Sequence, residues 1–180
     1  MALLRTTHLS RLIPSLLRAS RPLVLVACVG ASGGAFAQLF ANKDWQESPV
    51  PPPPAFSESR LVPIEMPPYL SLKFGVDPAT IAITGDGVVR YVVVASNRAG
   101  GATNAFYEGV RCATGEMKSY AHFASGNWET NKDPDWLPMR ALKSSYSLAL
   151  ATQALCRGGA PRETAREMMS YLKNPIREVQ

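Results

Sequence analysis

The sequence predicts an α+β fold, in which an antiparallel meander of four or five strands is covered by two C-terminal helices and tied to them by one disulfide. Strand-like segments rich in β-branched and aromatic residues follow one another through short turns over residues 61–123. Two segments with helical spacing of apolar residues fill most of residues 144–174. Each part contains one cysteine, Cys112 in the sheet and Cys156 among the helices.

The first 37 residues have the layout of a secretory signal peptide. An apolar run over residues 23–29 leads into a small-residue stretch that ends at Ala35-Phe36-Ala37. Four arginines and no acidic residue precede the run: Arg5, Arg11, Arg18 and Arg21. This order predicts cleavage between Ala37 and Gln38, and therefore export to the periplasm.

A second interpretation of the signal remains open. Residues 25–28, Leu-Val-Ala-Cys, resemble a lipobox, in which Cys28 would be lipidated and the protein anchored to the outer membrane. Only residues 23–27 separate Pro22 from Cys28, whereas the apolar core of a signal needs about 7–15 residues. This length favours cleavage at Ala37.

Removing the signal changes the composition. Of 180 residues, 180 − 37 = 143 remain, enough for one domain: a proline-rich extended lead-in over residues 38–57 and a single α+β domain over residues 58–180. The formal net charge falls from +5 to +1, because the four arginines leave 15 basic against 14 acidic residues. The remaining basic residues are isolated, which argues against nucleic-acid binding. We expect membrane contact only if Cys28 is lipidated.

Two cysteines remain after cleavage, and in an oxidising compartment they predict a Cys112–Cys156 disulfide. The alternative is two buried free thiols.

The lead-in contains Pro51 to Pro54, which favours a stiff polyproline II segment. It is either a docking motif for an aromatic groove or a spacer. We favour the spacer, with Trp45 packing back on it.

Strands are predicted in order along the domain. Residues 61–65 form an edge strand, since Pro63 cannot donate a ladder hydrogen bond. Residues 69–74 alternate polar and apolar, as in a half-buried strand. Asp77 to Thr80 form a turn, residues 80–84 a short strand, and Gly85-Asp86-Gly87 a tight hairpin.

Residues 88–95 form the strongest strand, apolar on both faces except for Arg90, and therefore central. Residues 105–113 and 117–123 complete the meander. Residues 124–143 are expected to be irregular, with Trp128 and Trp136 pinning the segment to the core rather than forming an exposed aromatic platform.

Two helices follow. Ser144 or Ser145 caps the first, which runs to about Cys156 and stops at Gly158-Gly159. Pro161 begins the second. Its apolar stripe, expected to be core, consists of Ala165, Met168, Met169 and Leu172.

No residue pattern indicates catalysis, a cofactor or a metal. His122 is the single histidine after residue 37, and it has neither a nucleophile elbow nor a spaced metal-ligand partner. Asp133 and Asp135 lack calcium-loop spacing.

Charged residues within apolar strands form the remaining candidate site. Arg90 and Glu108 would pair across the ladder if their strands are neighbours, either as a structural ion pair or as the floor of a ligand cleft. The candidate cleft consists of Arg90, Tyr91, Tyr107, Glu108 and Arg111.

Several segments resemble the cryptic neisserial protein family, small exported proteins of Gram-negative bacteria. They are Asp44-Trp45, residues 51–56, 61–80, 87–92 and 104–112, together with Tyr146-Ser147-Leu148-Ala149 and Leu155-Cys156. The resemblance implies export, as a periplasmic protein or a lipoprotein, and carries over no catalytic residue. We therefore expect a non-enzymatic envelope protein that binds an envelope protein or a small ligand. The alternatives are an enzyme with an unrecognised site and an outer-membrane lipoprotein with a structural role.

Overall fold

The structure, a computed structural model, describes residues 44–100 and 103–174. Cys28 and the predicted cleavage site, Ala37 and Gln38, lie outside the described residues. No helix in the described part of the chain is long and apolar enough to cross a membrane.

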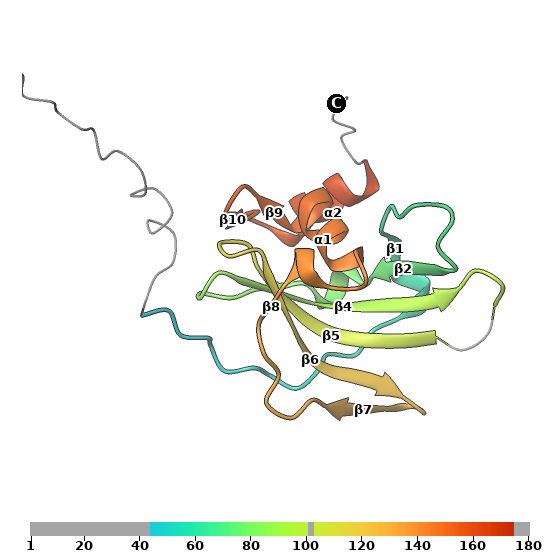
Figure 1. Cartoon of the computed structure of the whole chain (residues 1–180), viewed down its shortest axis with the longest axis horizontal. Helices are drawn as coiled ribbons and strands as arrows, with labels where there is room; N and C mark the ends of the chain where they lie inside the picture. Colours follow the sequence, from blue (N-terminus) through green and yellow to red (C-terminus); the bar gives the residue numbers. More distant parts are fainter. Residues whose placement is uncertain (1–43, 101–102, 175–180) are drawn as a thin grey trace, which may run out of the picture. The chain divides into compact units, whose positions relative to one another are not determined.

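An antiparallel sheet of eight strands forms the centre of the fold (Figure 1). The strands follow the chain in the order β1-β2-β4-β5-β6-β7, while β3 pairs with β4 and β8 pairs with β6. Their bounds are β1 Val62–Pro63, β2 Leu72–Val76, β3 Ala82–Ile83, β4 Val88–Asn97, β5 Thr103–Arg111, β6 Glu116–Ala124, β7 Asn127–Thr130 and β8 Leu137–Pro138. The predicted meander is confirmed, but the sheet is larger than the four or five strands expected.

The additional strands β7 and β8 come from residues 124–143, which were expected to be irregular. Ser125 and Gly126 both have positive φ, 51° and 83°. This is the conformation of a two-residue hairpin loop, and it turns β6 directly into β7. Pro138 lies in β8, a two-residue strand that pairs only with β6. A short edge strand of this kind tolerates proline.

β4 is the central strand that its composition predicts, with residues 88–94 all buried. Alternate side chains point to opposite faces of the sheet. Val89, Tyr91 and Val93 belong to the core beneath the helices, which we call the helical face. Val92 and Val94 belong to a second core on the opposite side.

The helical face is covered by α1 (Tyr146–Leu150), which continues into a π-helical turn, η4 (Ala151–Leu155), and by α2 (Ala165–Lys173). α2 does not begin at Pro161 as expected. Pro161 lies in β10 (Ala160–Pro161), paired with β9 (Cys156–Arg157). The helix begins after Thr164, whose hydroxyl accepts a hydrogen bond from the backbone amide of Glu167. This N-cap, rather than Pro161, sets the start of α2.

The predicted disulfide is present. Cys112 follows β5 and Cys156 follows η4, with their Cα atoms 5.6 Å apart. The bond joins the sheet to the helical layer. Short 3-10 helices complete the chain: η1 Glu58–Arg60, η2 Pro78–Thr80 and η3 Met139–Ala141.

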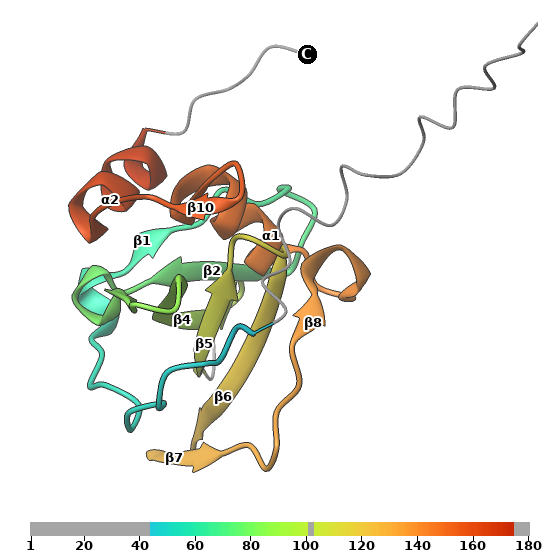
Figure 2. The same cartoon turned by 90° about the vertical axis from the view of Figure 1, so that its left-hand side faces the viewer.

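Residues 44–57, which we call the strap, cross the opposite face of the sheet, hereafter the strap face (Figures 1 and 2). The indole of Trp45 donates to the carbonyl of Asp86 at 2.8 Å, and Phe56 packs edge-on against Phe123 and Trp128. The spacer interpretation of this segment is therefore wrong for the described residues: its polar and aromatic groups hold it against the domain.

Candidate functional site

The five residues of the predicted cleft do not lie together. Tyr91 is paired with Glu108, and Arg90 with Gly109. Arg90, Tyr107 and Arg111 consequently lie on the strap face, whereas Tyr91 and Glu108 lie on the helical face. The predicted single cleft is not formed, and no Arg90–Glu108 ion pair exists.

Arg90 is buried, with its side chain only 2% exposed. Its guanidinium donates to the carbonyls of Ser48 and Pro49 at 2.7 and 3.1 Å. It also lies 3.9 Å from carboxylate oxygens of Glu47 and Asp86. These contacts make Arg90 an anchor for the strap. Arg111 has a similar role, because its guanidinium stacks 3.8 Å from the ring centre of Trp45.

Glu47 is the strap's other polar anchor. Its carboxylate accepts hydrogen bonds from Lys118 at 2.7 Å, Tyr120 at 2.6 Å and the indole of Trp136 at 3.3 Å. Trp128 packs against the core of the strap face as expected, whereas Trp136 attaches its segment to the strap rather than to the core.

The carboxylate of Asp86 binds a backbone amide of the strap. It accepts from the Ser48 amide at 2.6 Å, the Val88 amide at 3.2 Å and the hydroxyl of Thr84. Burial alone would raise the pKa of Asp86, but these hydrogen bonds lower it overall. The carboxylate therefore stays ionised beside Arg90.

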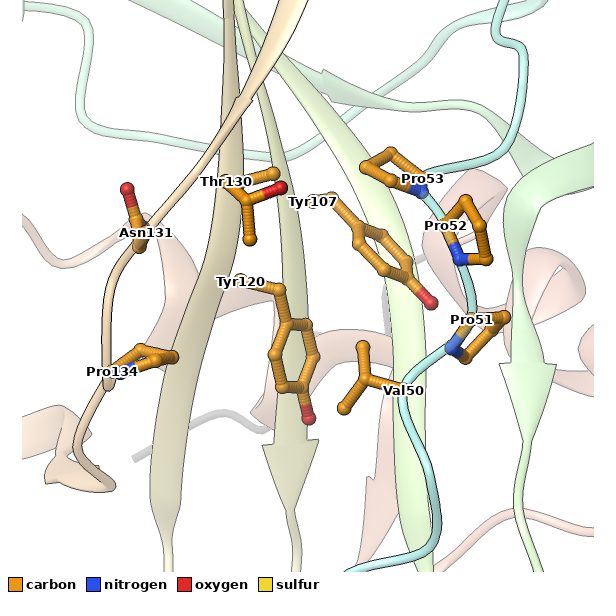
Figure 3. Close-up of a pocket in the computed structure, with 10 residues that line it drawn as sticks. Val50, Pro51, Pro52, Pro53, Tyr107, Tyr120, Thr130, Asn131 and Pro134 are labelled. Atoms are coloured by element: carbon orange, nitrogen blue, oxygen red, sulfur yellow. The ribbon is translucent and has the colours of Figure 1, made fainter.

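A pocket of about 390 Å³ lies between the strap and the sheet (Figure 3). Tyr107, Tyr120 and Ala121 belong to the sheet core of the strap face and form the pocket's sheet side. The strap supplies the second side, and the end of β7 with the segment after it supplies the third: Val50, Pro51, Pro52 and Pro53 face Thr130, Asn131 and Pro134.

A bulge in β6 positions Tyr120 for this pocket. Tyr107 of β5 pairs with Ala121 of β6, and Glu108 pairs with Ser119, so Tyr120 is the extra residue. Gly109 leaves room for the ring, since a Cβ there would lie 2.5 Å from the Tyr120 hydroxyl oxygen. The bulge and Gly109 together allow the ring centres of Tyr107 and Tyr120 to lie 5.3 Å apart.

The pocket is apolar and uncharged, with few polar groups. Tyr107 is 2% exposed, and its ring and hydroxyl line the pocket. In Figure 3 this hydroxyl is directed toward the strap side. The side-chain amide of Asn131 donates a hydrogen bond to the backbone carbonyl of Ser119 at 2.8 Å, which fixes the orientation of the Asn131 side chain. Burial raises the pKa of Tyr107, so the phenol remains protonated and available as a donor.

A second polar cluster occupies the helical face. The carboxyl of Glu108 is buried and accepts hydrogen bonds from Tyr91, at 3.1 Å, and from Tyr146 of α1. Burial raises the pKa of Glu108 to about 7, although both phenols oppose the shift. The cluster ties α1 to the sheet.

Neither polar cluster includes the histidine of β6. His122 lies on β6 and contacts Glu129 of β7 at 3.0 Å, with 42% of its side chain exposed. Among residues 44–100 and 103–174, no three His, Cys, Asp or Glu side chains are placed to hold a metal ion. Arg90 and Arg111 lie on the face opposite to Glu108, so these charges do not converge.

Of the pocket residues, sequence reasoning identified only Tyr107 as a site residue. The proline run was interpreted as a spacer rather than as a docking motif, and the structure places it across a pocket from two tyrosines of its own sheet. The sequence shows that Tyr107 and Tyr120 lie in consecutive strands of the meander. Their contact depends on a bulge in β6 that the sequence does not mark.

A model of the CNP1-like family matches residues 40–173. This is a bacterial family of unknown function, and it is consistent with the resemblance seen in the sequence. No curated protein matches the chain. No solved structure matches it either.

Proposed function

We propose that this chain, which belongs to the CNP1-like family, is an exported binding protein that takes a small neutral ligand into the pocket between strap and sheet. The observation that carries the proposal is the pocket itself, in which the hydroxyl of Tyr107 is directed toward the strap side. A ligand that hydrogen-bonds to this hydroxyl would gain about 0.5–1.5 kcal/mol from the bond.

The lining supports a ligand without charge. Arg90, Lys118 and Glu47 lie near the pocket but are engaged with one another and with the strap, and none of them lines it. A charged ligand would lose its hydration with no counter-ion in return. Tyrosine rings and proline rings favour an apolar ring, while Tyr107 and Asn131 favour one hydrogen-bonding group on it.

A matched set of probes tests this chemistry. Benzamide, benzoate and benzamidine share a shape and differ in charge, and each is titrated into the ¹⁵N-labelled protein by NMR. We expect benzamide to bind in about the millimolar range typical of so small a probe, and to shift the amides of Thr130 and Asn131. Benzoate and benzamidine should bind at least tenfold more weakly. Equal affinities, or shifts elsewhere, would refute the proposal.

Export is the second part of the proposal, and the layout of residues 1–37 supports it. Mass spectrometry of the protein recovered from a periplasmic fraction should give an N-terminus at Gln38. A diacylated N-terminal Cys28 would instead identify a lipoprotein of the outer membrane, and an intact Met1 would contradict export.

A further inference from the structure

A second hollow lies on the helical face, away from the strap pocket. It consists of two adjoining cavities, of about 400 and 160 Å³, which share Leu72, Phe74 and Ser144. The larger cavity extends over the sheet to Ala95 and Phe106. The smaller one extends to Leu70, Lys143 and Ser145. We call the two together the helical-face groove.

Most of the groove's sheet side is apolar, with Asn97 and Asn104 also lining the larger cavity, and part of it is exposed to solvent. Phe74 is buried and stacks on Tyr146 with ring centres 4.4 Å apart, whereas Leu72 is 40% exposed. Tyr69, one residue before the groove residue Leu70, is 83% exposed. Exposed apolar side chains gathered beside a hollow are typical of a binding surface.

The charge at the groove has one sign. Lys143 is the single charged residue lining it among the described residues. Arg98 lies at the same end, since its Nε donates to the carbonyl of Leu70 at 2.9 Å. No acidic residue lines the groove in the described part of the chain. An apolar trough with cations at one end complements an apolar chain with an anion at one end.

We propose that the helical-face groove binds an anionic amphiphile of the fatty-acid class. The alkyl chain lies over Leu72, Phe74 and Phe106, and the carboxylate lies at Lys143. The apolar chain gains from removing the exposed part of Leu72 from water. The carboxylate keeps partial hydration at the exposed Lys143, so its desolvation is small. This site is independent of the strap pocket, because the two occupy opposite faces of the sheet.

Isothermal titration calorimetry with decanoate, below its micelle concentration, tests the assignment. We expect saturable binding of one equivalent. Decyltrimethylammonium, which has the same chain and the opposite charge, should bind at least tenfold more weakly. Comparable affinity for the two would overturn the role of Lys143, and absence of saturable decanoate binding would overturn the site.

Three variants locate the ligand. Lys143→Glu should weaken decanoate binding at least tenfold and strengthen binding of the cationic amphiphile. Leu72→Glu should abolish decanoate binding, and because Leu72 is partly exposed the variant should keep the wild-type melting temperature. Lys173→Glu on α2, outside the groove, is the charge-matched control and should bind as wild type. If Ala121→Leu in the strap pocket abolishes decanoate binding while Leu72→Glu does not, the ligand occupies the other pocket and the proposal fails.

Discussion

The phenol of Tyr146 on α1 donates a hydrogen bond to the buried carboxyl of Glu108 on β5. Tyr91 on β4 donates to the other oxygen of the same carboxyl at 3.1 Å. Two strands and one helix are thus joined at one acidic group. The groups that face Glu108 are these two neutral phenols, and among the residues that the structure describes no cation offsets the burial of its charge.

This arrangement predicts that the protein loses stability as the pH rises. The folded state raises the pKa of Glu108 from 4.5 to about 7, so between these values the folded protein binds more protons than the unfolded chain. Stability from this group is fully present below pH 4.5 and is lost as the pH rises through 7. The difference corresponds to about 3 kcal/mol.

Urea unfolding at pH 5 and pH 8 measures the effect. We expect the free energy of unfolding to be lower at pH 8 for the wild type, and this difference to shrink in Glu108→Gln, which stays neutral. An equal pH dependence in both proteins would show that Glu108 titrates normally.

Replacing Gly109 with alanine should destabilise the fold and displace Tyr120. The added Cβ would lie 2.5 Å from the Tyr120 hydroxyl oxygen and 2.9 Å from Val88 Cγ1. Overpacking of this kind costs about 1–3 kcal/mol. Gly85→Ala is the matched control, because a Cβ there meets no atom within 4 Å. Thermal denaturation of both variants checks the prediction, and similar melting temperatures would contradict it.

Removing the disulfide should lower the free energy of unfolding by more than the loss of any single non-covalent contact. Cys112 and Cys156 are separated by 44 positions, and closing a loop of this length stabilises the fold by about 4 kcal/mol in the chain-entropy model. We expect Cys112→Ser/Cys156→Ser to unfold at lower urea concentration, and dithiothreitol to have the same effect on the wild type. The double variant serves as the control, since the reductant should leave its unfolding midpoint unchanged.

The strap should loosen without Glu47. Glu47→Ala removes the acceptor for Lys118, Tyr120 and Trp136 and leaves their donors to water. Hydrogen bonds to charged groups contribute about 1.5–3 kcal/mol. Hydrogen exchange of the Ser48 amide, which bonds to Asp86, reports strap opening and should accelerate at least tenfold. Glu58→Ala, which removes an exposed contact to Thr103, should leave that rate unchanged. An unaltered rate in Glu47→Ala would show that the strap is held by other contacts.

Local patterns accounted for most of the sheet. The apolar run at residues 88–95 marks a central strand, and glycines at the β3–β4 hairpin mark a turn, because both depend on neighbouring residues alone. The Met168 and Met169 stripe is buried as its spacing predicts. β7 escaped prediction because its hairpin loop places Ser125 at positive φ, a conformation that serine rarely adopts.

The candidate site could not be predicted in the same way. Whether Arg90 faces Glu108 or Gly109 depends on register, and a shift of one residue exchanges the faces. The pocket also requires the strap to lie on the sheet, which rests on contacts between residues far apart in the sequence, such as Trp45 with Asp86, 41 positions apart. The spacing of apolar residues along the sequence does not indicate which distant residues will be in contact.

The affinity of Tyr107→Phe for benzamide tests whether the hydroxyl of Tyr107 in the strap pocket binds a ligand. Tyr171→Phe on α2 is the matched control. Loss of a hydrogen bond worth about 0.5–1.5 kcal/mol should weaken binding about three- to tenfold in Tyr107→Phe alone. Equal benzamide affinity in wild type, Tyr107→Phe and Tyr171→Phe would show that the Tyr107 hydroxyl does not bind the ligand.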